Sequence, residues 1–186
     1  MRKLEVNKMK LKAFAVTLLT TIVLGACNGE SANDDNPRKE VEMQNIKELV
    51  NEYSGNKTKD ESASITSNQL IVTDKEGIES AYALPEDEFF VSVAPYINET
   101  HPCTNHSLTG CQGELANKDI AVYIEDSKGN VLVDETMKTL ANGFIDLWLP
   151  RDQTYNIKME HKGKTVESIF STYESEGTCI TTMQLK

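Results

Sequence analysis

Apolar and polar residues alternate with a period of two along much of the chain from Gln69 to its C-terminal end. This alternation is typical of strands that bury one face of a sheet. Turn signals separate most of the apolar runs, among them Asp74–Gly77, Asp126–Asn130 and Lys162–Lys164. The predicted strands are Gln69–Thr73, Ile78–Leu84, Phe89–Ala94, Ile120–Glu125, Val131–Glu135, Gly143–Leu149, Tyr155–Glu160, Thr165–Phe170 and Cys179–Leu185. Several short strands with this spacing predict a β-sandwich.

A helical period precedes the strands. Apolar residues recur there at i, i+3, i+4 and i+7 and so share one helical face: Ile46, Leu49, Val50 and Tyr53. We expect a helix over Pro37–Tyr53, because proline suits the first helical position and Ser54-Gly55 provides an end signal. The apolar face must be buried, either on the following domain or on a second copy of the chain in a homodimer.

The region between the helix and the strands is polar. Residues 56–67, NKTKDESASITS, predict a linker or irregular segment. The fold class expected is therefore α+β and mainly β. A helical segment over residues 37–68, with a dimerisation role as one option, precedes a β-rich, sandwich-like domain over residues 69–186.

The N-terminus has the pattern of an export signal. Five basic residues and one acidic residue precede 14 uncharged residues, Ala13–Ala26, which would span about 21 Å as a helix, short of a bilayer core of about 30 Å. The run ends in Leu24-Gly25-Ala26-Cys27, which resembles a bacterial lipobox. We expect residues 1–26 to be a lipoprotein signal peptide, Cys27 to be lipidated and residues 27–36 to be a tether. The alternative is an ordinary signal peptide with a coincidental cysteine.

The net charge of the chain limits the classes of partner that it can bind. The 186 residues include 29 acidic and 19 basic side chains, for a net charge of −10, and removal of residues 1–26 makes it −14. Such a surface repels phosphate, so we exclude nucleic acid as a partner. We expect an exported protein of the bacterial cell envelope that is held at a membrane by its lipid anchor and not by its surface charge.

The candidate chemistry is concentrated in one short segment. His101, Cys103, His106 and Cys111 lie within eleven residues, and Pro102 and Gly110 predict that the segment is an irregular loop. Thiolates select Cu(I), zinc or iron–sulfur centres, and imidazole suits copper or zinc. Cys179 adds another ligand if the fold brings the last strand beside this loop.

Disulfide chemistry is the competing interpretation, because exported cysteines meet an oxidising compartment. Cys103 could pair with Cys111, or either could pair with Cys179, and each choice leaves one thiol over. An odd cysteine in an exported protein calls for a partner, a metal or a redox role. The spacing matches no zinc-finger pattern, and no Cys-x-x-Cys motif is present. A thiol–disulfide redox partner and an interaction module with a structural disulfide remain alternatives.

Three segments carry a more specific signal. They are Phe89–Leu115, Asn142–Met159 and Thr178–Leu185, and they resemble the CueP family of envelope copper-binding proteins. The resemblance implies copper binding by three cysteines, which correspond here to Cys103, Cys111 and Cys179. It also implies copper resistance, copper supply to an exported superoxide dismutase, thiol-dependent reduction of Cu(II) to Cu(I), and a helical dimerisation part before a β-rich part.

The expected function is that of a copper-binding protein and not of an enzyme. Three thiolates would hold Cu(I), with His101 or His106 assisting or taking Cu(II) first, and zinc is a substitute metal. The lipobox departs from the soluble members of the family, so the recipient stays open: a copper-receiving or a thiol-redox protein of the envelope.

Overall fold

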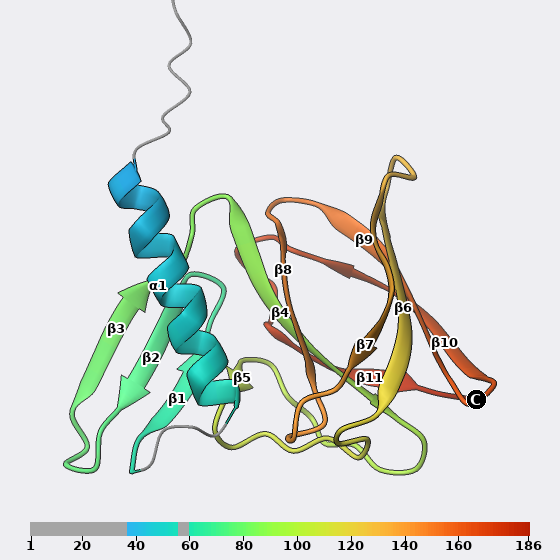
Figure 1. Cartoon of the computed structure of the whole chain (residues 1–186), viewed down its shortest axis with the longest axis horizontal. Coiled ribbons are helices and arrows are strands. Elements are labelled where there is room, and N and C mark those ends of the chain that lie inside the picture. The colour runs from blue at the N-terminus through green and yellow to red at the C-terminus, as the bar shows by residue number, and fades with distance from the viewer. Residues whose placement is uncertain (1–36, 56–59) are drawn as a thin grey trace, which may run out of the picture. The chain divides into compact units, whose positions relative to one another are not determined.

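The computed structural model describes the backbone of residues 37–55 and 60–186, and side chains from residue 45 onward. The predicted signal peptide, the lipidation site Cys27 and the tether lie outside the described residues. Within the described part, one helix, α1 (Pro37–Ser54), precedes eleven strands in three sheets (Figure 1). No helix of this part is long and apolar enough to cross a membrane.

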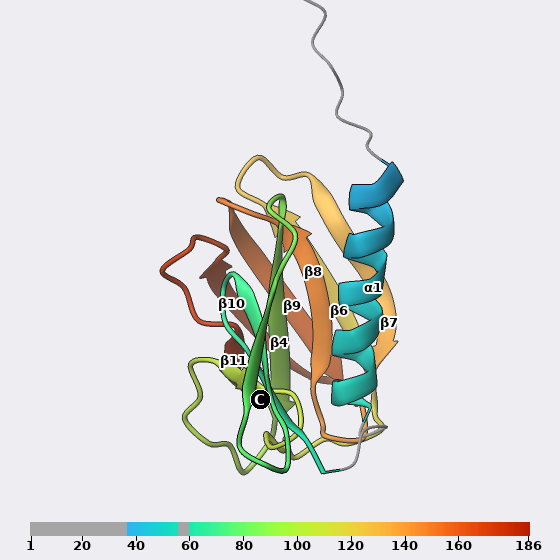
Figure 2. The same ribbon diagram turned by 90° about the vertical axis from the view of Figure 1, so that its left-hand side faces the viewer.

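Two of the sheets form the sandwich. One has the order β11-β4-β8, with bounds Cys179–Gln184, Glu88–Tyr96 and Ile145–Pro150. The other has the order β10-β9-β6-β7, with bounds Lys164–Ser171, Thr154–His161, Asp119–Asp126 and Val131–Lys138. All neighbours are antiparallel except β11 and β4, which run parallel. Figure 2 shows β4 and β8 in one layer with β6 and β9 behind them.

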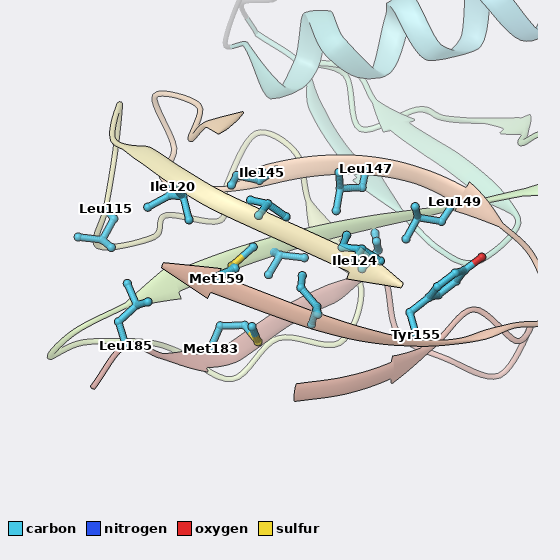
Figure 3. Packing of buried hydrophobic residues seen from close by; sticks show 14 of the residues in the cluster. Leu115, Ile120, Ile124, Ile145, Leu147, Leu149, Tyr155, Met159, Met183 and Leu185 are labelled. Atoms are coloured by element: carbon cyan, nitrogen blue, oxygen red, sulfur yellow. The ribbon is translucent and has the colours of Figure 1, made fainter. Parts of the chain in front are cut away.

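The core between these two sheets follows from the period-two pattern. Alternate residues of β4, β6, β8 and β9 are buried in it, and Figure 3 shows Ile120, Ile124, Leu147 and Met159 converging on the same space. The prediction of a β-sandwich is confirmed. Each predicted strand is present, with ends that differ from the prediction by three residues or fewer.

A third sheet lies beside the sandwich and carries the helix. Its order is β3-β2-β1-β5, with bounds Glu79–Ala83, Gln69–Thr73, Ser62–Ile65 and His106–Ser107. The helix crosses this sheet in Figure 1. Ile46, Val50 and Tyr53 are at most 9% exposed and pack with Ile65 and Leu70 of the sheet. The predicted apolar face is therefore confirmed, and it covers the following domain of its own chain.

The linker prediction is wrong at its C-terminal end. Ser62–Ile65 forms β1, which pairs with β2 on one side and with β5 on the other. Ala63 and Ile65 point into the core, at 2% and 0% exposure, while the serines between them keep the segment polar in composition. Four residues are too few to show a period-two pattern in the sequence. This strand forms because it pairs with strands that are distant along the chain.

A half-buried carboxylate, that of Asp146, ties the end of the helix to the sandwich. Asp146 of β8 accepts hydrogen bonds from Ser54 Oγ, at 2.6 Å, and from Ser92 Oγ of β4, at 2.5 Å. Burial raises the pKa of Asp146, and the two hydroxyl donors oppose that rise. The helix, β4 and β8 thus share one polar contact within otherwise apolar packing.

Candidate metal centre

Four of the predicted ligand side chains lie close together in space. They are Cys103, His106, Cys111 and Cys179, and their ligand atoms all lie within 4.8 Å of one another. The first three belong to the connection between β4 and β6, in which β5 is the only regular element among the described residues. Cys179 is the first residue of β11. The structure thus brings the last strand beside the cysteine-containing loop.

Cys179 is positioned by the pairing of β11 with β4, in which seven of nine residues are buried. In the parallel pairing of β11 with β4, Cys179 lies opposite Ser92, which is fully buried. Its backbone N–H donates to the carbonyl of Thr104, at 3.1 Å, and so fixes the loop against the strand. Gly177 is required for this approach, because a Cβ there would lie 2.6 Å from the Thr104 oxygen.

His106 is held through Thr178. The buried Thr178 hydroxyl donates to the carbonyl of Ile65, at 2.6 Å, and accepts from the backbone N–H of His106, at 2.9 Å. His106 also pairs with Ile65 through β5 and β1. One hydroxyl therefore links the residue before Cys179 to the strand pair that carries the imidazole.

The rest of the loop is fixed by backbone contacts. Gly113 donates to the carbonyl of Asn142, at 2.6 Å, and Gly143 adopts a φ of +83° with no room for a Cβ against the Gly113 carbonyl. The exposed Glu114 carboxylate, which follows the cysteines of the loop, accepts the N–H groups of Asn98, Ile97 and Glu99, which precede them. These donors, Asn98 first, lower the pKa of Glu114 to about 2. The loop is thus anchored on both sides of its cysteines.

Two of the three sulfur atoms of the cluster are joined in a disulfide. Cys103 and Cys179 form a disulfide with a Cα–Cα separation of 5.6 Å, and Cys111 is the free thiol among the described cysteines. Cys111 Sγ lies 3.6 Å from Cys103 Sγ, and Cys179 Sγ lies 3.6 Å from His106 Nδ1. Of the pairings left open by the sequence, the structure has the one between the loop and the last strand.

The surroundings of His106 favour the neutral form of its imidazole. Its side chain is fully buried, its ring centroid lies 4.4 Å from that of Phe144, and Nε2 finds no hydrogen-bond partner among the described residues. Burial, followed by the effect of His101, lowers the pKa of His106 to about 4. The ring is neutral at pH 7, which is the form that binds a metal ion.

His101 is not part of the four-residue cluster. Its ring packs against Phe144 at a centroid distance of 6.2 Å, so the two imidazoles share one aromatic neighbour. Its Nε2 is buried and, like that of His106, has no hydrogen-bond partner in the described part of the chain. The structure therefore places His101 next to the site and His106 in it.

The cluster is suited to a soft metal ion once the disulfide is reduced. Thiolate–metal bonds are about 2.3 Å long, so two ligands on opposite sides of one ion are at most about 4.6 Å apart. The observed upper limit of 4.8 Å lies within a small adjustment of this value. Three thiolates and one neutral imidazole could then share an ion, whereas the disulfide leaves Cys111 and His106 as free donors.

Sequence reasoning missed the two residues that support the ligands. Thr178 and Phe144 contact His106, but a threonine and a phenylalanine carry no metal-binding signal. The position of Thr178, directly before Cys179, is the one feature that points to it.

Two comparisons with known proteins find matches to the chain. A family model described as "Periplasmic copper-binding protein CueP" matches residues 44–184, a span that includes all four clustered residues. A solved structure, described as "Crystal Structure of S.CueP", is 38% identical, with a TM-score of 0.72, over 76% of this chain and 88% of that chain. None of the curated proteins matches the chain.

The Thr178 hydroxyl gives a test of how the site is held together. Thr178→Val keeps the shape but leaves the His106 N–H and the Ile65 carbonyl without their partner, so we expect a loss of about 2–4 kcal/mol in the free energy of unfolding. Thr178→Ser retains the hydroxyl and is the matched control, with a loss of about 1 kcal/mol for one methyl group. Urea unfolding of the disulfide-bonded proteins measures both, and equal losses in the two variants would contradict the proposed role of the hydroxyl.

Proposed function

The chain belongs to the CueP family of periplasmic copper-binding proteins, and on that premise we propose that it binds Cu(I) through Cys103, Cys111 and Cys179. His106 is the fourth ligand in this proposal. The observation that carries it is the convergence of three sulfur atoms and one imidazole nitrogen within 4.8 Å. Copper resistance or copper delivery in the cell envelope is the role that such a site would serve.

The donor set favours Cu(I) over harder ions. Thiolates are soft ligands that select Cu(I) or zinc, whereas carboxylates and carbonyls suit magnesium or calcium. The four clustered ligand atoms come from cysteine and histidine alone. A Cys₃His set also fits tetrahedral zinc, so zinc is the substitute metal in this proposal.

The disulfide supports a reductive step for Cu(II). In this step two thiolates each give one electron, two Cu(II) ions become two Cu(I) ions, and one S–S bond forms. Cys103 and Cys179 are the pair assigned to it, because they are the pair that the structure joins. Cys111 then remains as a thiolate ligand 3.6 Å from Cys103 Sγ. The step is stoichiometric, so a thiol-redox protein of the envelope must reduce the disulfide before the next cycle.

We assign the first contact with Cu(II) to His101. The His101 side chain is half-buried and lies beside the cluster, whereas His106 is fully buried. Imidazole binds Cu(II) well, and a nitrogen ligand is not itself oxidised.

Competition for Cu(I) tests the proposal. The fully reduced protein should withdraw one equivalent of Cu(I) per chain from a chromogenic chelator, and bind zinc more weakly. Each single Cys→Ser change at positions 103, 111 and 179 should weaken Cu(I) binding by more than the roughly 10–100-fold that loss of an outer-shell contact costs. His106→Gln should weaken it less, because it removes one ligand of four and no thiolate.

The matched control is His161→Gln. His161 is also largely buried, but its Nδ1 contacts the Asp119 carbonyl at 2.8 Å, away from the cluster, so Cu(I) affinity should not change. Failure of the reduced protein to compete for Cu(I), or equal binding by the triple Cys→Ser variant, would overturn the proposal.

We also propose that the protein is exported and lipid-anchored through Cys27. The support is the basic segment, the uncharged run and the lipobox at residues 24–27. With a net charge of −14 after cleavage, the mature chain would be repelled by anionic lipid, so acyl chains would have to supply the anchoring.

Labelling with a palmitate analogue tests the anchor. The protein expressed in bacteria should incorporate the label and fractionate with membranes, and Cys27→Ser should do neither. Cys111→Ser, which changes a different cysteine, should be labelled like the original. Label that persists in Cys27→Ser, or a mature N-terminus other than Cys27, would contradict lipidation at this residue.

A further inference from the structure

We propose that the disulfide of this protein is not fixed but moves within the cluster, between Cys103–Cys179 and Cys103–Cys111. Cys103 is common to both pairs, and the free thiol alternates between Cys111 and Cys179. This exchange needs no metal and so does not rest on the proposed copper function.

The first observation is the position of the free thiol. Cys111 Sγ lies 3.6 Å from Cys103 Sγ, one of the two sulfur atoms of the disulfide. Thiol–disulfide exchange proceeds by attack of a thiolate on a disulfide sulfur. A disulfide bond is about 2.05 Å long, so the two sulfur atoms have to approach by about 1.5 Å.

The second observation concerns which parts of the cluster can adjust. Cys103 and Cys111 are both in irregular backbone on either side of the two-residue strand β5. Cys179 begins β11 and is fixed by pairing with β4. Side-chain rotation of Cys103 and Cys111 can therefore change the partner of Cys103, while the backbone bond from Cys179 to Thr104 and the sandwich stay as they are.

The third observation is a polar partner for the sulfur that leaves. Cys179 Sγ lies 3.6 Å from His106 Nδ1 in a buried setting, so the departing thiolate meets an imidazole and not only apolar atoms. In the reverse direction the same nitrogen lies beside the Cys179 thiol as it attacks. His106 is a positioning residue in this exchange.

The exchange balances within the chain. The Cys111 thiol loses its proton to solvent, the Cys111–Cys103 bond forms, and the Cys103–Cys179 bond breaks with its electron pair on Cys179, which takes up a proton. One disulfide and one thiol are present before and after, so no oxidant or reductant is required.

Movement of the disulfide changes which thiol is available after oxidation. In the described isomer the free thiol is the half-buried Cys111. In the other isomer it is Cys179, which is 8% exposed but lines a groove of about 320 Å³ together with Ser168–Ser171 of β10. A small reagent can therefore reach either thiol, and an oxidised protein presents its remaining sulfur ligand at either of two places.

Disulfide mapping without metal tests this inference. The oxidised, chelator-treated mature protein is incubated at pH 8 with N-ethylmaleimide for increasing times, quenched with acid, which stops exchange, and digested with pepsin. We expect the label at both Cys111 and Cys179, with a Cys103–Cys111 disulfide in every molecule labelled at Cys179. A tenfold dilution should leave the ratio of the two labels unchanged, since the exchange is intramolecular.

Two variants complete the design. Cys111→Ser should retain the Cys103–Cys179 disulfide and take up no label at Cys103 or Cys179, because no thiol of the cluster remains to attack it. Cys179→Ser should form Cys103–Cys111 in its place. Label confined to Cys111 at all times, a ratio that changes with protein concentration, or failure of Cys179→Ser to form its disulfide while folded by circular dichroism would overturn the proposal. Copper binding is not measured, so these results stand apart from those of the Cu(I) competition.

Discussion

Burial of β4 on both of its faces is the constraint on which the rest of the structure depends. Phe89, Val91 and Val93 point into the core of the sandwich, whereas Phe90 points toward the helix and the third sheet. The strand is therefore the shared wall of two cores, and β11 pairs with it in parallel. Because Cys179 starts β11 opposite the buried Ser92, the position of one sulfur is set by packing that involves most of the chain.

The candidate metal centre lies where these two cores meet. Its imidazole belongs to the third sheet through β5, one sulfur belongs to the sandwich through β11, and the other two sulfurs belong to the loop that joins them. The Thr178 hydroxyl holds the imidazole side and the sulfur side together. These contacts do not involve the sulfur–sulfur bond, so they join the two sides of the cluster independently of the disulfide. The site thus combines one sulfur on a strand with two sulfurs in irregular backbone.

The period-two segments could be predicted from the sequence because one face of each is buried, and burial sets the pattern. β1 and β5 could not, since they contain four and two residues and form only by pairing with distant strands. The cluster of Cys103, His106 and Cys111 could be predicted because these residues are close along the chain. The partner of Cys103 could not, because disulfide connectivity depends on spatial distance, and Cys179 lies 76 residues away.

The central claim is that three thiolates and one imidazole share a single Cu(I). X-ray absorption at the copper K-edge of the anaerobically reduced, Cu(I)-loaded protein tests it most directly. The claim predicts an edge typical of Cu(I) and a first shell fitted by three sulfur atoms near 2.3 Å, with one nitrogen that is lost in His106→Gln. A shell of nitrogen and oxygen alone, or one that is unchanged in the triple Cys→Ser variant, would contradict it.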